Sequence, residues 1–398
     1  MTKFLKKTGA AALVLLLAGN TQALAAISAN VSVTPHQASF DRERSAEEWA
    51  KLRDNKIEWD ELQDLVHEYN PTVSNAWITF RQQDHNGAYN IDYEAALGAI
   101  DDNYTDAVAA ANGNALQEAL AAMQQQVSSA QTTVDSSEQS TDREAAKLTI
   151  CKTELTSTET IRKSIINYYS SGLQLEMDKL TEKHLQTQYE TAQRKQAVGS
   201  ATNLDTLAAK ESAEQAKLTV QSDETSRNKS LQLIRVNLGW KYNDSPELCA
   251  VPMPTEAQLS AMELEADTKT ALANNYSIAI NERKLAVSEA DSSRSSLSTT
   301  IENEKQAVKS DMISRSQAVR QAQNSLAQAQ LTQSNAENTL QKVQRNCNVG
   351  SASARDLEDA QYTADTAALS TKIAEYSLAT AYYDYVAAVN GLATADQS

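Results

Sequence analysis

The sequence predicts an all-α protein, built from long antiparallel coiled-coil helical hairpins in two tandem structural repeats with little or no β-structure. One observation is a repeat: Val198-Gly199-Ser200-Ala201 returns as Val349-Gly350-Ser351-Ala352, 151 positions later. Another is composition, because the 398 residues include only 10 glycines and 5 prolines, and much of the 41% hydrophobic content is alanine. Such a chain suits long helices with thin, small-residue seams better than a thick globular core.

The N-terminus has the pattern of a secretory signal peptide. Three lysines precede an apolar run from Ala10 to Ala18, and Ala23-Leu24-Ala25 supplies the small residues of a cleavage site. We therefore expect residues 1–25 to be removed and the mature chain to be exported. Asn20 stands where a lipoprotein signal has its cysteine, so the sequence predicts no lipid anchor there.

Charge and hydropathy exclude two classes. The formal charge is −16, and removal of residues 1–25 takes away three lysines and no acidic residue, which leaves −19. A chain this acidic is a poor ligand for nucleic acid. Beyond the signal peptide, no apolar stretch approaches the roughly 18 residues that a membrane-spanning helix needs.

The duplication divides the mature chain into two repeats with a leader, a linker and a tail. Three prolines, Pro246, Pro252 and Pro254, mark the linker. The predicted segments are the leader 26–55, the first repeat 56–239, the proline-containing linker 240–262, the second repeat 263–392 and the tail 393–398.

Each repeat is predicted to run through a short helix, an asparagine-containing joint, a long helix, a tip turn and a returning helix. Asn70-Pro71 and Asn274-Asn275 mark the joints. Gly239 and Gly391 end the returning helices, 40 and 41 residues after the tip glycines. The two hairpins are therefore nearly equal in length.

The repeated tetrapeptide predicts the tip of a helical hairpin. Glycine supplies the positive φ that ends an incoming helix. Thr202 and Asp205 follow the first copy, and Ser353 and Asp356 follow the second at the same spacing. Ser/Thr-x-x-Asp is a helix-start signature, in which the hydroxyl takes a free backbone N–H and the carboxylate reaches back to the cap.

The second repeat predicts one very long helix, from about Thr268 to Arg345, with coiled-coil packing. Apolar and small residues recur every seven positions along it. One series is Met312, Val319, Leu326, Gln333 and Leu340, and the other is Ala322, Ala329, Ala336 and Val343. A buried Gln333 in this seam would fix the register of the packed helices.

Aromatic residues predict two packed regions. Trp49, Trp59 and Trp77 indicate either a small packed collar or a partner-binding patch, and core packing is favoured. Tyr382, Tyr383 and Tyr385 favour the seam between the repeats. Two interpretations are open for Ala76–Tyr93: strand-like patterning, or continuation of the helix that begins near Thr72 and a turn at Gly87.

The chain contains no recognisable catalytic constellation. Its histidines share no helical face and form no metal-ligand motif. They are His36, His67, His85 and His184. Acidic side chains on long helices are expected mostly on solvated faces and as i, i+4 partners of Lys and Arg. We therefore predict a non-enzyme with no metal site and no cofactor.

Three cysteines allow two interpretations. Cys151, Cys249 and Cys347 are widely spaced and lack a C-x-x-C motif. An exported chain permits one disulfide, and the spacing names no pair. The alternative is that all three are unpaired small residues.

With these elements in order, the chain resembles the outer-membrane efflux protein (TolC) family over roughly residues 56–392. The resemblance lies in the order of the pieces, which occurs twice. The pieces in the first half are Glu61-Leu62, Asn70-Pro71, Tyr168-Tyr169, Val198-Gly199 and Asp205. Those in the second half are Ala271 to Asn275, Val349-Gly350, Asp356, and Asp384-Tyr385 before Gly391.

The resemblance implies a TolC-like α-barrel protomer that assembles as a homotrimer. Its tips would dock to a periplasmic-adaptor-like protein and an inner- or cytoplasmic-membrane transporter. The implied docking and aperture residues are Val198, Gly199, Ser200, Asp205, Val349, Gly350, Ser351, Arg355 and Asp356. Six aspartates from three copies would meet at one constriction, where like charges raise each other's pKa and attract cations. A helix cap is the other interpretation of Asp205 and Asp356, and the two roles are compatible.

The chain departs from the family where each half normally inserts transmembrane β-strands. Only 74 positions separate Asn275 from Val349, and they are polar, alanine-rich and free of strand alternation. Residues 100–165 are similar in character. The sequence thus predicts a variant without transmembrane strands.

Two function classes follow. The first is a TolC-like exported component of a transport or efflux system, forming a helical tunnel that docks through its tips. The alternative is a non-conducting exported coiled-coil scaffold or spacer of the cell envelope. The expected location is the cell envelope, either at an outer membrane or in a periplasm-like space. The missing strands also suit the extracellular face of a single-membrane cell.

Overall fold

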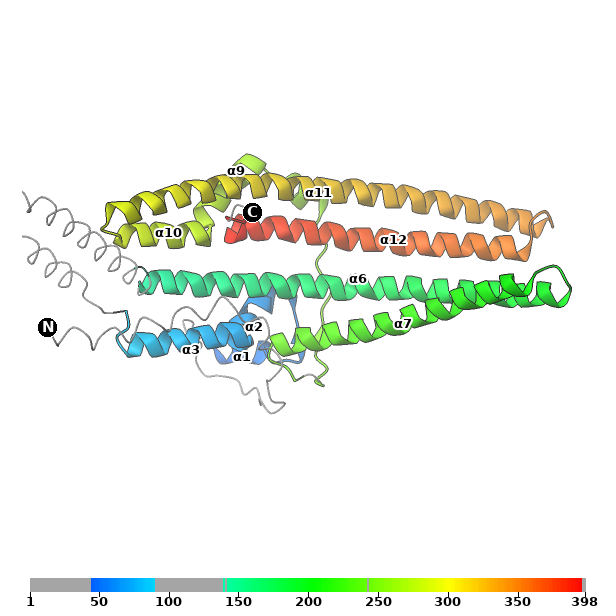
Figure 1. Ribbon diagram of the computed structural model, residues 1–398, viewed down its shortest axis with the longest axis horizontal. Helices are drawn as coiled ribbons and strands as arrows, with labels where there is room; N and C mark the ends of the chain where they lie inside the picture. The colour runs from blue at the N-terminus through cyan, green and yellow to red at the C-terminus, as the bar shows by residue number, and fades with distance from the viewer. Residues whose placement is uncertain (1–43, 90–138, 140–141, 242, 396–398) are drawn as a thin grey trace, which may run out of the picture.

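A layer of four long helices dominates the computed structural model, which describes residues 44–89, 139, 142–241 and 243–395 (Figure 1). The signal peptide and residues 26–43 of the leader lie outside this part, as do residues 396–398. Across the layer the order is α11, α12, α6 and α7. Their bounds are α6 Arg143–Ala197, α7 Asn203–Asn237, α11 Asp291–Asn348 and α12 Ala354–Ala387. The predicted all-α fold of long antiparallel hairpins is confirmed.

Short elements form a collar on the first repeat. They are α1 Ala46–Lys51, β1 Lys56–Ile57, η3 Trp59–Glu61, α2 Leu62–Tyr69, α3 Pro71–His85 and, from the linker, β2 Glu247–Leu248. The strands pair in parallel, Lys56 with Glu247, so the linker returns to the start of the repeat. Trp77 is buried in the collar core, and Trp49 and Trp59 pack against it, which confirms the packed collar.

The second repeat has its own core between short helices and the α11–α12 pair. Its short elements are α8 Glu256–Ser260, α9 Leu264–Asn274, α10 Tyr276–Val287 and the π-helical segment η4 Ala388–Leu392. Met312 and Val319 are buried at the predicted heptad positions, and Leu326 packs against the same core. The prediction of a buried Gln333 is wrong, because this side chain is half-exposed and donates to Glu337 of its own helix at 2.8 Å.

The prediction of one helix from Thr268 to Arg345 is also wrong. The chain breaks at Asn275 and again at residues 288–290, where it reverses so that α10 lies beside α11 (Figure 1). Ser288 adopts an extended conformation with ψ of 133°. Its carbonyl accepts a hydrogen bond from the Arg294 guanidinium at 2.8 Å, which fixes the turn without glycine or proline.

Both repeats contain the same lock between the joint and the returning helix. The Asn70 side chain caps α3 by accepting from Thr72 N–H at 3.0 Å, and its Nδ2 donates to the Asn237 carbonyl at 3.1 Å. Asn275 caps α10 in the same way and donates to the Ala393 carbonyl at 2.9 Å. One buried amide therefore satisfies backbone groups of two segments in each repeat.

Glycine is required where the returning helices end against these locks. Gly239 and Gly391 have φ of +78° and +110°. A Cβ atom would lie 2.5 Å from Tyr69 Cβ at the first position and 2.4 Å from the Asn274 carbonyl oxygen at the second. Only glycine allows this close approach without strain.

The structure also decides between the interpretations left open for residues 76–93 and for the cysteines, and it places Tyr383. The segment from residue 76 is helical to His85 and turns at Gly87, which confirms the helical interpretation up to residue 89; residues 90–93 lie outside the described part. Cys151, Cys249 and Cys347 all lie in the described residues, and no disulfide joins any two of them. Tyr383 donates to the Pro252 carbonyl at 2.8 Å and lies against the Trp59 ring, which confirms its place in the seam.

Candidate functional site at the hairpin tips

The two tips have the same backbone geometry. Gly199 and Gly350 adopt φ of +76° and +74° after the last turns of α6 and α11. The next N–H, of Ser200 or Ser351, donates across the turn to the Lys195 or Asn346 carbonyl at 2.8 Å. This is the bond that closes a Schellman turn, and it needs a left-handed residue, which glycine supplies.

Both tip aspartates cap the returning helices. Asp205 Oδ2 accepts from Thr202 N–H at 2.8 Å and from its hydroxyl at 2.7 Å. Asp356 Oδ2 accepts from Ser353 N–H and hydroxyl, each at 2.8 Å. These hydrogen bonds hold the pKa of both carboxyls below the usual Asp value, and the bond from the backbone N–H has the larger effect. The predicted capping boxes are confirmed, and an aperture role stays a prediction.

The side chains around the two tips differ. Val198 and Val349 are both 78% exposed. Beyond them the first tip presents the exposed side chains of Leu204 and Leu207. At the equivalent positions, 151 residues on, the second tip has Arg355 and Glu358, and Arg355 Nε lies 3.8 Å from Asp359. One tip is therefore apolar and the other is charged.

A contact between the hairpins lies above the tips and was not predicted. The His184 ring of α6 stacks on the Tyr362 ring of α12, with centroids 4.2 Å apart. Thr181 and Tyr362 hydroxyls are 3.0 Å apart, and His184 Nδ1 lies 3.8 Å from Asp359. No local pattern signals this contact, because its partners are far apart in sequence.

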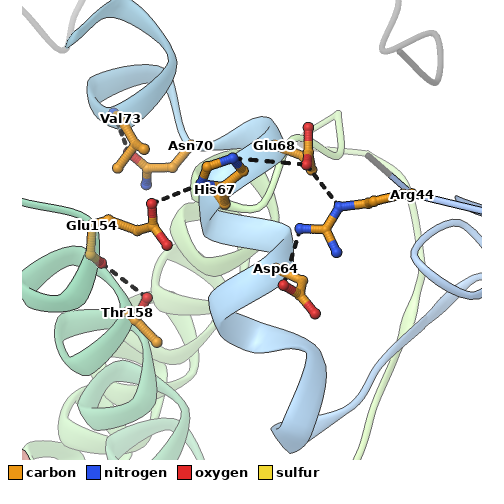
Figure 2. A network of polar contacts seen from close by, with 8 residues as sticks. All are labelled: Arg44, Asp64, His67, Glu68, Asn70, Val73, Glu154 and Thr158. Carbon is orange, nitrogen blue, oxygen red and sulfur yellow. Dashed lines mark hydrogen bonds and ion pairs between the residues drawn. The ribbon is translucent and has the colours of Figure 1, made fainter. Parts of the chain in front are cut away.

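A buried polar network joins α2 to α6 in the collar (Figure 2). His67 Nδ1 lies 2.7 Å from Glu154 Oε2, and both side chains are buried. On the other side of α2, the Arg44 guanidinium donates to Glu68 at 2.8 Å and to Asp64 at 3.0 Å. The network links the leader segment, the short helix and the long helix of the first repeat.

Five glutamates are buried, two in the collar and three on the long helices, where acidic side chains are expected mostly on solvated faces. The buried glutamates are Glu61, Glu68, Glu154, Glu159 and Glu304. Four of them face a cationic or titratable partner: Lys51, Arg44, His67 or Arg162. Glu304 instead accepts from the Asn281 amide at 2.7 Å. Burial raises the pKa of Glu159, and Arg162 offsets part of the shift.

The described residues contain neither a cluster of metal ligands nor a helix suited to span a membrane. Within residues 44–89, 139, 142–241 and 243–395, no three His, Cys, Asp or Glu side chains cluster as metal ligands. In the same part of the chain, no helix combines the length and apolar content of a membrane span.

Two helical repeats with both tips at one end and a collar beside the first repeat constitute a TolC-like fold. Solved structures confirm it. An 11% identical membrane protein from Pseudomonas aeruginosa superimposes with a TM-score of 0.52, covering 87% of this chain and 94% of that one. The open-state outer membrane channel MtrE of Neisseria gonorrhoeae, 13% identical, gives 0.51 over 85% and 91%. CusC, solved in a study of transmembrane channel formation and 12% identical, gives 0.51 over 90% and 97%. No protein-family model and no curated protein matches the sequence.

Proposed function

We propose that this protein is an exported component of a transport or efflux system that forms a helical conduit in the cell envelope. The main support is the structural similarity of nearly the whole chain to solved proteins. One of them, MtrE, is described as an outer membrane channel, and another, CusC, was solved in a study of transmembrane channel formation. A single layer of four helices encloses no space. The conduit therefore requires several copies, and the proposed assembly is a homotrimer.

The proposed docking surface is the pair of tips. Val198 and Val349 project from identical turns at the same end of the molecule, and each is 78% exposed. A large apolar side chain at that exposure contributes nothing to the fold of one chain. Presented twice, it suits contacts with an adaptor protein that links the conduit to a membrane transporter.

The proposed aperture uses Asp205 and Asp356. Both of their cap bonds use the single oxygen Oδ2, so capping and an aperture role are compatible. Three copies would gather six carboxylates at the tip end. Such a ring favours the passage of cations.

Conductance across a planar bilayer tests the conduit. We expect discrete channels with a cation preference in the reversal potential. Asp205→Asn with Asp356→Asn keeps a capping side chain but removes six charges from the assembly, so the preference for cations should fall. Glu265→Gln with Glu302→Gln is the matched control, because it also removes six charges from three copies and both side chains are exposed and far from the tips in sequence. Channels with unaltered ion preference in the double variant would refute the aperture, and absence of channels would refute conduction.

One observation supports a second candidate, a non-conducting envelope scaffold. Between Asn275 and Val349 the chain consists of α10, a three-residue turn and α11, with no strand in this fully described stretch. A scaffold would present the same tips without conducting. Recovery of the native protein from an envelope fraction without detergent, together with no channel activity, would favour this candidate.

A further inference from the structure

A polar cavity lies at the seam between the two repeats, where α6 of the first repeat packs against α10, α12 and η4 of the second (Figure 1). Its volume is about 230 Å³. An engineered cavity of about 150 Å³ in another protein holds a benzene molecule, so this one has room for a small organic compound. Boundaries between structural units are preferred places for such ligands.

One face of α6 forms the first wall of the cavity. Five lining side chains recur at intervals of three or four residues, which is the spacing of neighbours on one helix face. They are Lys152, Thr156, Glu159, Thr160 and Lys163. Thr156 and Thr160 are exposed, so this side of the cavity opens to solvent.

The second repeat forms the opposite wall. It contributes Ser277 from α10, Arg315 from α11 and Asp384 from α12, together with backbone of residues 391–395. Part of this wall is the π-helical segment η4, in which Gly391 has φ of +110°. Single turns of π-helix occur frequently at functional sites.

Both carboxylates that line the cavity already have cationic partners. Asp384 Oδ1 lies 2.6 Å from Lys163 Nζ, an ion pair that crosses from α12 to α6. Glu159 accepts a hydrogen bond from the Arg162 guanidinium on the next turn of its own helix. The cavity therefore offers no unpaired carboxylate to a cationic ligand.

Lys152 is the lining cation without a carboxylate partner. Its ammonium donates to the Ser277 hydroxyl at 2.7 Å, and none of the described Asp and Glu residues forms an ion pair with it. Arg315, by contrast, donates to Asp311 at 2.7 Å and to the Asp384 carbonyl at 2.9 Å. An ammonium has three donors, so two of those on Lys152 are available to solvent or a ligand. A partly buried lysine normally pairs with an anion.

The charge balance indicates an anionic ligand with one charge. Three cationic side chains and two carboxylates line the cavity, which leaves a net charge of 3 − 2 = +1. The partners just outside it, Arg162 and Asp311, cancel each other. Phosphate is usually held by an arginine fork, and the Arg315 fork is already engaged. A single ammonium next to hydroxyl groups suits a carboxylate.

We infer that this cavity binds a small organic carboxylate, with Lys152 as its ion-pair partner and the hydroxyls of Ser277 and Thr156 as further hydrogen-bonding groups. Lys152 belongs to the first repeat and Ser277 to the second, so a ligand held by both connects the repeats. A ligand that binds only the folded state stabilises it. Bound carboxylate therefore strengthens the seam. The site needs only one copy of the chain, so it is independent of the proposed conduit.

Binding of simple carboxylates to the purified full chain tests the ligand class. Isothermal titration calorimetry with acetate, lactate and 3-hydroxybutyrate should detect one site per chain for at least one of them. We expect a dissociation constant on the order of 1 mM, which suits a ligand of few atoms. Lactamide has the shape of lactate without its charge and should not bind. Equal binding of lactamide, or no binding of any carboxylate, would overturn the inference.

Substitution of Lys152 tests the ion pair. Lys152→Met keeps an unbranched side chain but removes the charge, so the dissociation constant should rise about tenfold or more. Lys229→Met is the matched control, because it removes an exposed lysine from α7, which does not line the cavity. Equal affinities of the Lys152→Met variant and the wild type would contradict the site.

Ser277→Ala is a second, milder variant, which also serves if Lys152→Met fails to fold. It keeps the ammonium and removes one hydroxyl, so binding should weaken about threefold. Circular dichroism checks that each variant is folded. Wild-type affinity in Ser277→Ala would exclude this wall of the cavity from the site.

Lysine modification locates the ligand directly. Lactate should slow the reaction of Lys152 with an N-hydroxysuccinimide ester and leave Lys229 unaffected, as measured by mass spectrometry of the digested protein. Equal rates at Lys152 with and without lactate would place any bound ligand elsewhere and overturn the inference. Equal protection by inorganic phosphate would overturn the carboxylate class. Each result is read on single chains, so none of them depends on whether copies form a conduit.

Discussion

The two repeats share their tips and locks but differ where the chain turns back at the other end. In the first repeat, residues 86–142 separate α3 from α6; in the second, three residues join α10 to α11. The first also buries the His67–Glu154 network, whereas the second buries the single carboxylate of Glu304. The two repeats share the features that require a particular residue type for a particular backbone conformation, such as a positive-φ glycine or a capping asparagine. They differ in segments and cores that many different side chains can fill.

The largest effect should come from breaking the network that only the first repeat has. Glu154→Leu leaves His67 buried without its 2.7 Å partner and should lower the free energy of unfolding by about 3–5 kcal/mol. Chemical denaturation measures this change. The matched control, Glu265→Ala, breaks the exposed pair with Lys269 in the second repeat and should change stability little. Equal losses in the two variants would show that the network is not a special feature of the first repeat.

The glycines that end the returning helices should rank next, with similar effects in the two repeats. Gly391→Ala places a Cβ against a backbone oxygen at φ +110° and should cost about 3 kcal/mol. Gly239→Ala brings its Cβ to 2.5 Å from Tyr69 Cβ, an atom fixed to the backbone that cannot swing away, so it should cost nearly as much. Gly350→Ala, at φ +74° with open space around the new Cβ, is the control for backbone strain alone. Denaturation midpoints that rank these three alike would contradict the lock.

A gain of stability should follow removal of the buried carboxylate of the second repeat. Glu304 lies between Ile301 and Val308 on the buried face of α11, and its Oε2 accepts no hydrogen bond within the described residues. Glu304→Leu should raise the free energy of unfolding by about 1 kcal/mol, because an apolar side chain replaces an incompletely satisfied polar one. Glu302→Leu, exposed on the same helix, is the control. A loss of stability in Glu304→Leu would show that the Asn281 hydrogen bond outweighs desolvation.

The smallest effect concerns the caps, where both repeats should behave alike. The folded-state pKa of Asp205 and of Asp356 lies below 3.8, so each cap stabilises the fold above that value and its contribution is lost as pH falls through the lowered pKa. The variants Asp205→Ala and Asp356→Ala should therefore have a lower melting temperature than the wild type at neutral pH. In strong acid their melting temperatures should equal that of the wild type. Thermal unfolding across this range measures the difference. A difference that persists below the folded pKa would exclude the carboxylates as its source.

Sequence patterns predict the parts of this fold that short segments determine. The tip turn, the capping boxes and the heptad seam each depend on residues within a few positions of one another. The collar follows from aromatic residues gathered in one stretch, including Trp59 and Trp77. The tip turn and the capping boxes locate both hairpin tips in the sequence. The proposed docking and aperture roles of the tips depend on partners and on further copies of the chain.

The features that sequence could not predict depend on distant residues or on unmarked turns. His67 and Glu154 are 87 positions apart, and no local pattern pairs them. The reversal at residues 288–290 contains neither glycine nor proline, and the hydrogen bonds that hold it come from side chains, such as that of Arg294 to the Ser288 carbonyl and that of Ser288 to the Lys284 carbonyl.

End-on electron microscopy of the purified mature protein distinguishes a conduit from a single open layer. We expect a closed ring of three copies, each contributing α6, α7, α11 and α12, with every tip at one end of the ring. Particles that show a single four-helix layer with both edges free, at all protein concentrations and with detergent present or absent, would contradict it.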